Sequence, residues 1–171
     1  MSILENRRKY RELIGEYITA FAEIEFYMSL YDAMIKNQET YKVDLVTTFA
    51  TPLKVKIKHI RNFIKEQFSV ELFTTWQLLE AEILDLNQSR SYLVHGTGFS
   101  DFWAPTIKTM LDVDQKNQQL QFKEFNAEDL RLLCERVYHV LTGENGIQGV
   151  FLQALLSEMR GKFGQDASSR Q

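Results

Sequence analysis

The sequence predicts a mainly α-helical protein, an up-and-down bundle of about five helices with a β-hairpin inserted at residues 106–125. Apolar residues recur every three to four positions over several long stretches, which is the period of an amphipathic helix. Residues 106–113 and 119–125 instead alternate with a period near two around a short polar stretch. The chain of 171 residues is long enough for one core. We therefore expect a single domain over residues 1–163 and a disordered tail over 164–171.

Helices are expected, in order, over residues 10–35, 52–68, 69–94, 126–141 and 147–160. Thr51 is expected to cap the second helix, with Pro52 at its first helical position. Asn126 is placed to cap the fourth helix. Gly96 is a typical stop for the third. An isolated hairpin is marginally stable, so the hairpin is expected to pack against the helices.

Charge, cysteine content and hydropathy narrow the classes of function. The net charge of −3 argues against a general nucleic-acid coat but allows a local basic patch. The single cysteine, Cys134, falls on the apolar side of a predicted helix, which favours a core residue in a reducing compartment. The N-terminus lacks the apolar segment of a secretory signal, and no apolar run reaches the roughly 18–20 residues that span a bilayer. We expect a cytoplasmic protein that has no membrane partner.

The end of the third predicted helix carries the candidate site. At about 100° per residue, Arg90 falls on the same apolar stripe as Ile83 and Val94. A guanidinium in that position keeps its proton, so it needs a carboxylate, a phosphate or a water-filled cleft beside it. Glu25 interrupts the apolar stripe of the first helix and is the expected partner. His95 follows at the helix end.

Four basic residues of the second predicted helix follow the spacing i, i+4, i+7, i+11 and form one stripe: Lys54, Lys58, Arg61 and Lys65. One interpretation is a solvated helix face. The other is a surface that tracks phosphates, because four like charges in a line repel one another unless an anion lies beside them.

The sequence Arg90-x4-His95-Gly96 at the end of a long bundle helix resembles the R-x4–6-H motif of the HEPN superfamily. Those are small helical proteins, many of them ribonucleases of toxin–antitoxin, phage-defence and RNA-processing systems. The order of parts is similar as well: a long first helix with Phe-Ala-Glu-Ile-Glu (21–25), a second with Lys-Ile-Lys-His (56–59), and the motif closing the third. Two positions depart from the pattern. Ser91 stands where Asn or Asp is common, and Thr97 stands where toxins paired with nucleotidyltransferase antitoxins often have Tyr, which argues against that partnership.

The resemblance implies metal-independent cleavage of RNA, in which the ribose 2′-hydroxyl attacks the adjacent phosphate and leaves a 2′,3′-cyclic phosphate. Arg90 would hold the phosphate oxygens, and His95 would move protons near neutral pH. Because one histidine does not readily act as both base and acid, the resemblance implies a homodimer whose two motifs face one cleft. Asn87 and Ser91 would support the site, and Glu25 would orient Arg90. We expect no cofactor and no metal; the expected partners are RNA, a second copy, and an antitoxin or other protein.

Two other interpretations stay open. In the first, Arg90 and Glu25 form a structural ion pair and His95 interacts with the helix dipole. The protein is then a binding or scaffold module, antitoxin-like or a nucleic-acid adaptor. In the second it is a metal enzyme, but bundle sites of that class need Glu-x-x-His pairs on facing helices. The nearest approach is a single Glu135-x3-His139. The remaining histidine, His59, is expected to be an ordinary surface or partly buried residue.

Overall fold

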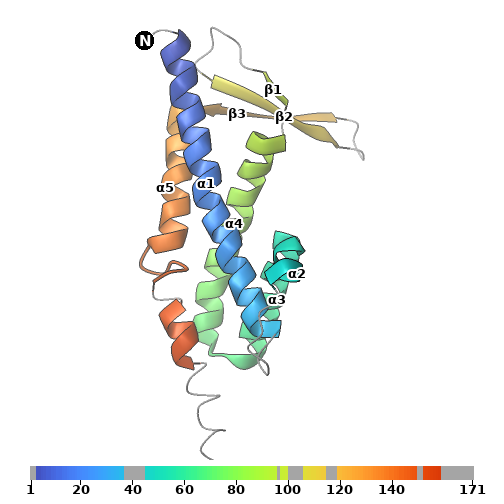
Figure 1. Cartoon of the computed structure of the whole chain (residues 1–171), viewed down its shortest axis with the longest axis vertical. Helices are drawn as coiled ribbons and strands as arrows, with labels where there is room; N and C mark the ends of the chain where they lie inside the picture. The colour runs from blue at the N-terminus through green and yellow to red at the C-terminus, as the bar shows by residue number, and fades with distance from the viewer. Residues whose placement is uncertain are drawn as a thin grey trace, which may run out of the picture. The chain divides into compact units, whose positions relative to one another are not determined.

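The computed structural model describes residues 3–36, 45–95, 97–99, 106–114, 119–149 and 152–158. It is mainly α-helical, as the sequence predicts, and includes one three-stranded antiparallel sheet (Figure 1). The helices are α1 (Ile3–Lys36), α2 (Leu45–Ala50), α3 (Leu53–Gln67), α4 (Val70–His95) and α5 (Ala127–Thr142), and residues 152–158 are also helical. The strands are β1 (Thr97–Phe99), β2 (Thr106–Asp114) and β3 (Gln119–Asn126). The expected tail over 164–171 lies outside the described residues.

The chain divides into two compact units, and both α1 and α4 contribute to each of them. Unit 1 comprises residues 1–22 and 84–138, and unit 2 comprises residues 23–83 and 139–171. Unit 1 therefore holds the start of α1, the end of α4, the sheet and most of α5. Unit 2 holds the remainder of α1 and α4 together with α2 and α3.

The predicted hairpin is confirmed. Strands β2 and β3 pair in antiparallel fashion, with Thr106 opposite Asn126. Strand β1 pairs with the other side of β2, where Thr97 lies opposite Met110. The sequence analysis missed β1, because three residues are too few to show an alternating pattern.

Of the two predicted N-terminal caps, the structure has the one of α5 but not the one of α3. Asn126 caps α5 as predicted: its Oδ1 accepts from the Asp129 N–H at 2.8 Å, and Asp129 Oδ2 accepts from the Asn126 N–H at 2.8 Å. The cap predicted at Thr51 is wrong. The cap position of α3 is Pro52, with φ −59° and ψ 141° and no side-chain cap, because Thr51 closes a preceding turn onto the Thr48 carbonyl.

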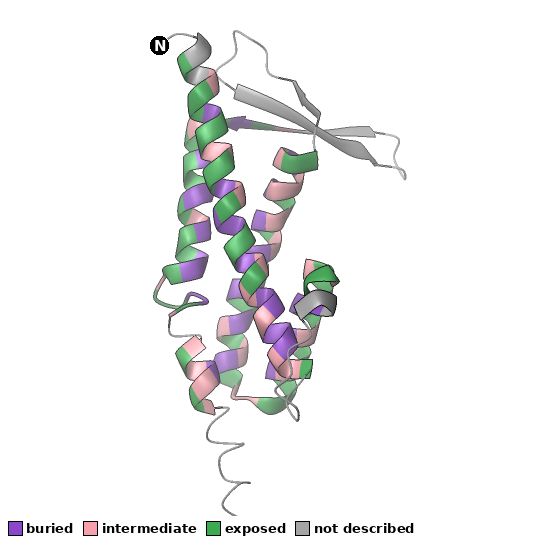
Figure 2. Ribbon diagram, viewed as in Figure 1, coloured by how far each residue is buried: buried purple, intermediate pink, exposed green. Residues whose placement is uncertain are grey.

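The core of unit 1 is formed by buried residues of α1, α4, β3 and α5, which are coloured purple in Figure 2. Cys134 is buried there, as expected, with its Sγ 3.5 Å from the Leu13 carbonyl oxygen. Burial raises the pKa of the Cys134 thiol to about 11. The main buried residues are Tyr17, Phe21, Leu86, Tyr92, Phe125, Leu130, Cys134 and Val137.

The core of unit 2 lies along one face of α3 and is completed by α1 and α4. The buried face of α3 has the helical spacing that the sequence predicts, and the Tyr31 hydroxyl donates to the Ile147 carbonyl at 3.0 Å. At the start of α4, the Ser69 N–H and hydroxyl both donate to the Glu158 carboxylate, at 3.0 and 2.7 Å. The main buried residues are Ile24, Met28, Tyr31, Ile57, Ile60, Ile64, Trp76 and Ile83.

Candidate functional site

Arg90 lies half-buried in the C-terminal part of α4, within unit 1. Its guanidinium carbon is 5.6 Å from the centre of the Phe21 ring, and that ring is fully buried. The electron-rich face of an aromatic ring attracts a cation, so this contact holds the Arg90 side chain against α1. Burial raises the pKa of the nearby Tyr17 hydroxyl, and the charge of Arg90 is one of the smaller effects that oppose the rise. Arg90 is thus positioned by an aromatic core.

His95 is exposed and is the last residue of α4. Five residues along a helix correspond to a rise of about 7.5 Å and a rotation of about 140°. Arg90 and His95 therefore leave one helix in clearly different directions, one toward the core and one toward solvent. The two side chains thus start from different sides of α4.

The two expected supporting residues on α4 are joined to each other. The Ser91 hydroxyl donates to the Asn87 carbonyl at 3.0 Å, and both residues are half-buried. Because its one proton is used inside the helix, Ser91 offers a ligand only the lone pairs of its oxygen.

Val94, expected on the buried stripe, is 44% exposed. It lies one residue before the end of α4, where the apolar stripe is no longer buried.

Glu25 is half-buried on α1 in unit 2, whereas Arg90 belongs to unit 1. The expected pair of Glu25 with Arg90 stays a prediction. Within unit 2, the carboxylate of Glu25 acts on Lys56: burial lowers the pKa of this lysine, and the negative charge of Glu25 is the largest effect that opposes the lowering. The structure thus gives Glu25 a role that the sequence analysis did not assign.

The basic stripe on α3 is only partly available to a ligand. Lys54, Lys58 and Lys65 are exposed. Arg61 instead places its Nη1 3.1 Å from Glu80 Oε1 on α4, and Glu80 is largely buried. The stripe therefore offers a ligand three exposed lysines, whereas Arg61 forms an ion pair that links α3 to α4.

A polar network between α1 and α3 in unit 2 was missed by the sequence analysis. Asp32 is fully buried, with Oδ1 2.9 Å from His59 Nδ1 and Oδ2 2.6 Å from Lys36 Nζ. Next to it, Lys56 Nζ donates to the Ser29 hydroxyl oxygen at 2.7 Å, and both residues are buried. His59 is partly buried, which is one of the two positions expected for it, and it contacts a buried carboxylate.

The sequence contained a signal for this network. Asp32 comes four residues after Met28, so the apolar spacing of the first helix places it on the buried face. A buried carboxylate needs cations or hydrogen-bond donors. His59 and Lys36 are the groups that satisfy this one.

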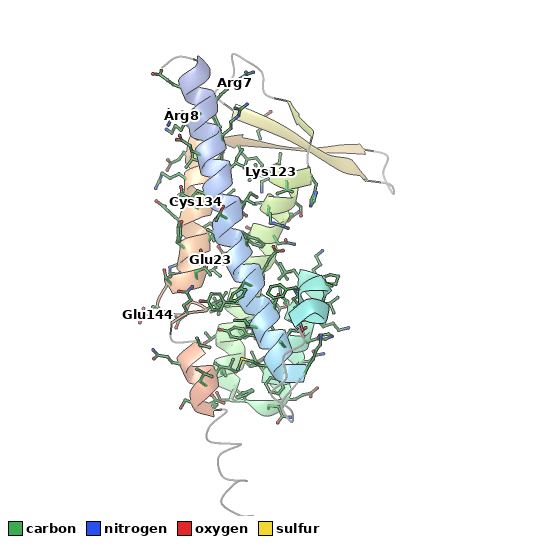
Figure 3. The ribbon with its side chains drawn as sticks, in the orientation of Figure 1. Arg7, Arg8, Glu23, Lys123, Cys134 and Glu144 are labelled. Carbon is green, nitrogen blue, oxygen red and sulfur yellow. The ribbon has the colours of Figure 1, made fainter. Side chains whose placement is uncertain are left out.

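Lys123 on β3 is a further cation near the α4 segment that carries the motif (Figure 3). Its Nζ donates to the Ser89 hydroxyl oxygen at 3.0 Å and lies 5.7 Å and 5.2 Å from the ring centres of Tyr92 and Phe125. Ser89, Lys123, Phe125 and Arg136 are among the residues that line an open hollow of about 330 Å³. Lys123 is therefore anchored by a hydroxyl and two rings.

Among the described residues, no three His, Cys, Asp or Glu side chains are grouped so that they could hold a metal ion. None of the described helices combines the length and apolar character that crossing a membrane requires. Comparisons with models of protein families, with curated proteins and with solved structures found no match.

Proposed function

We propose that the chain is a metal-independent endoribonuclease of the HEPN type, which cuts RNA and leaves 2′,3′-cyclic phosphate ends. The observation that supports this best is the Arg90–Phe21 contact on the helix that ends in an exposed His95. A guanidinium supported on a buried ring is held in place before a substrate arrives. An imidazole at the helix end is open to solvent and to a substrate.

The chemistry needs two proton transfers and the stabilisation of negative charge. One imidazole takes the proton of the ribose 2′-hydroxyl as its oxygen attacks phosphorus, and a second proton goes to the departing 5′-oxygen. The guanidinium offsets the charge that develops on the phosphoryl oxygens. His95 and Arg90 are the residues we assign to these roles, with Asn87 and Ser91 in support.

We propose that the active form is a homodimer in which two motifs form one composite site. The support is geometric: Arg90 and His95 start about 140° apart around α4, an arrangement in which a second copy can complete the site. It also supplies a second histidine, so that one imidazole can act as base and the other as acid, whereas a site with a single histidine would work less efficiently. The proposal places the protein in the cytoplasm, with RNA as substrate and an antitoxin or another protein as a further partner.

The deciding experiment is cleavage of a labelled RNA pool in EDTA by the wild type, His95→Ala and Arg90→Ala. We expect cyclic-phosphate ends from the wild type and a loss of rate of at least about 100-fold in each variant. The controls are His139→Ala and Arg131→Ala, which remove the same residue types from exposed positions of α5. They should cleave at the wild-type rate. If the wild type and the four variants are all folded and cleave RNA at the same rate, Arg90 and His95 have no catalytic role.

A mixing experiment tests the composite site. Arg90→Ala and His95→Ala proteins, each inactive alone, are combined and allowed to exchange subunits. Mixed dimers keep one intact Arg90 and one intact His95, so partial activity should return. A monomer by light scattering at micromolar concentration, with full activity, would overturn the composite arrangement.

The second candidate is a nucleic-acid-binding module without catalysis, and the exposed Lys54, Lys58 and Lys65 favour it. Lysines in one line neutralise phosphates and release counterions, so the affinity for RNA falls as salt rises. Replacing the three lysines with Gln should weaken RNA binding and flatten its salt dependence. Binding without cleavage by the wild type would select this function.

A further inference from the structure

Asp32 holds two side chains next to each other on unit 2. Its carboxylate is fully buried, one oxygen contacts His59 Nδ1 and the other contacts Lys36 Nζ. The side chains of His59 and Lys36 are themselves 39% and 40% exposed. A buried group therefore orients two groups that solvent and ligands can reach.

The contact with Asp32 sets the chemistry of the imidazole. An ionised carboxylate only accepts hydrogen bonds, so Nδ1 of His59 must carry a proton. The neutral ring then has its lone pair on Nε2, on the opposite side of the ring from Asp32. When the ring is protonated, Nε2 becomes a donor in the same direction. In either state Nε2, which does not contact Asp32, is the nitrogen through which His59 can bind a ligand.

We propose that His59, Lys36 and Asp32 form a binding site for a phosphate monoester. Near neutral pH such a group is partly protonated, with a second pKa of about 6, so it offers both P–OH and P–O⁻. The Nε2 of His59 accepts from P–OH or, when protonated, donates to P–O⁻, and the Lys36 ammonium pairs with a second oxygen. Asp32 is the positioning residue.

The dissociable proton of a monoester, and not the charge of the site, favours it over a diester. The positive charges of Lys36 and Lys56 balance the negative charges of Asp32 and Glu25, which are the charged groups of α1 and α3 in this network. A singly protonated monoester brings its own proton, which its P–OH can donate to the neutral Nε2 of His59. A phosphodiester has no second dissociable proton and so gains less from the imidazole.

The proposal does not depend on ribonuclease activity, and its test measures binding alone. Inorganic phosphate is titrated into the full-length protein at constant ionic strength, with the histidine ring nitrogens observed by NMR. We expect the His59 resonances to show the Nδ1-protonated form and to shift on binding. His139, an exposed histidine of α5, is the reference. If phosphate shifts the His59 resonances no more than those of His139, the proposal is overturned.

Variants separate binding from a structural role. His59→Gln and Lys36→Met, both at half-buried or exposed positions, should each weaken phosphate binding by about tenfold or more. His139→Gln and Lys9→Met, both at exposed positions outside this site and outside the basic stripe, are the matched controls and should not. Asp32→Asn should weaken binding and also shift His59 away from the Nδ1-protonated form. If folded His59→Gln binds phosphate with the wild-type affinity, the proposed site is wrong.

The source of the phosphate is distinguished with a trinucleotide that carries either a 5′-phosphate or a 5′-hydroxyl. Tighter binding of the phosphorylated trinucleotide than of inorganic phosphate identifies the end of a nucleic acid as the ligand. Equal binding of the two identifies the phosphate group itself, and both outcomes support the proposal. If the 5′-hydroxyl trinucleotide binds as tightly as the 5′-phosphorylated one, the proposal is overturned, and the surface instead binds phosphodiesters.

Discussion

The Tyr17 hydroxyl donates a hydrogen bond to the carbonyl oxygen of Leu86 across 2.5 Å, inside the core of unit 1. Within α4 the Leu86 carbonyl is also the regular acceptor for the Arg90 N–H, four residues later. Tyr17 therefore binds the turn of α4 from which the Arg90 side chain leaves. Together with Phe21, which contacts the guanidinium, it makes α1 the element that positions Arg90.

Tyr17→Phe should lower the free energy of unfolding by about 1–2 kcal/mol, because it removes a buried hydrogen bond while keeping the ring. Urea unfolding followed by circular dichroism measures the change. The control is Tyr138→Phe, which removes the same hydroxyl from an exposed position on α5. A stability loss that is equal in the two variants would contradict the importance of the buried contact.

Phe21→Leu should reduce RNA cleavage by about tenfold or more, because the guanidinium of Arg90 loses the ring face against which it rests. The apolar volume is nearly kept, so the cost in stability should be modest, about 1–2 kcal/mol. Single-turnover cleavage rates below the unfolding temperature measure the effect. Phe26→Leu, at an exposed position of α1, is the control. An unchanged rate in Phe21→Leu would show that Arg90 needs no such support.

Asn126→Ala should cost about 1 kcal/mol of stability, because the Asp129 N–H at the start of α5 loses its acceptor. Asn126→Asp should restore most of it, since a carboxylate accepts the same hydrogen bond. Thermal unfolding of the wild type, Asn126→Ala and Asn126→Asp gives the order of their stabilities. Asp and Ala variants of equal stability would mean that the β2–β3 pairing alone sets the start of α5.

Stability should fall as pH rises from about 9 to 11. Burial raises the pKa of Cys134 to about 11, and the thiol of the unfolded chain loses its proton nearer 8.5. Burial raises the pKa of Tyr17 as well. Above pH 9 the unfolded chain binds fewer protons than the folded one, so alkali favours unfolding; below pH 8 this contribution to stability is complete. Urea midpoints at several pH values test this, and Cys134→Ala should flatten the slope.

Some features of this protein follow from the sequence because they depend on neighbours a few residues apart. The helical period indicates the long helices and the buried position of Cys134, and the alternation indicates the hairpin of β2 and β3. The pair Asn126 and Asp129 is a local capping pattern. The same spacing places Arg90 on an apolar stripe, and the structure has it half-buried.

Other features were decided only by the tertiary structure, because they join residues far apart in the chain. Asp32 meets His59 across 27 positions, and Tyr17 meets Leu86 across 69. Periodicity shows which face of a helix is buried but not which neighbour faces it. It therefore indicates that Arg90 needs a partner without naming Phe21, and that Asp32 is buried without naming His59. Those pairings depend on which helices pack together and in which register, and a single sequence does not encode that choice locally.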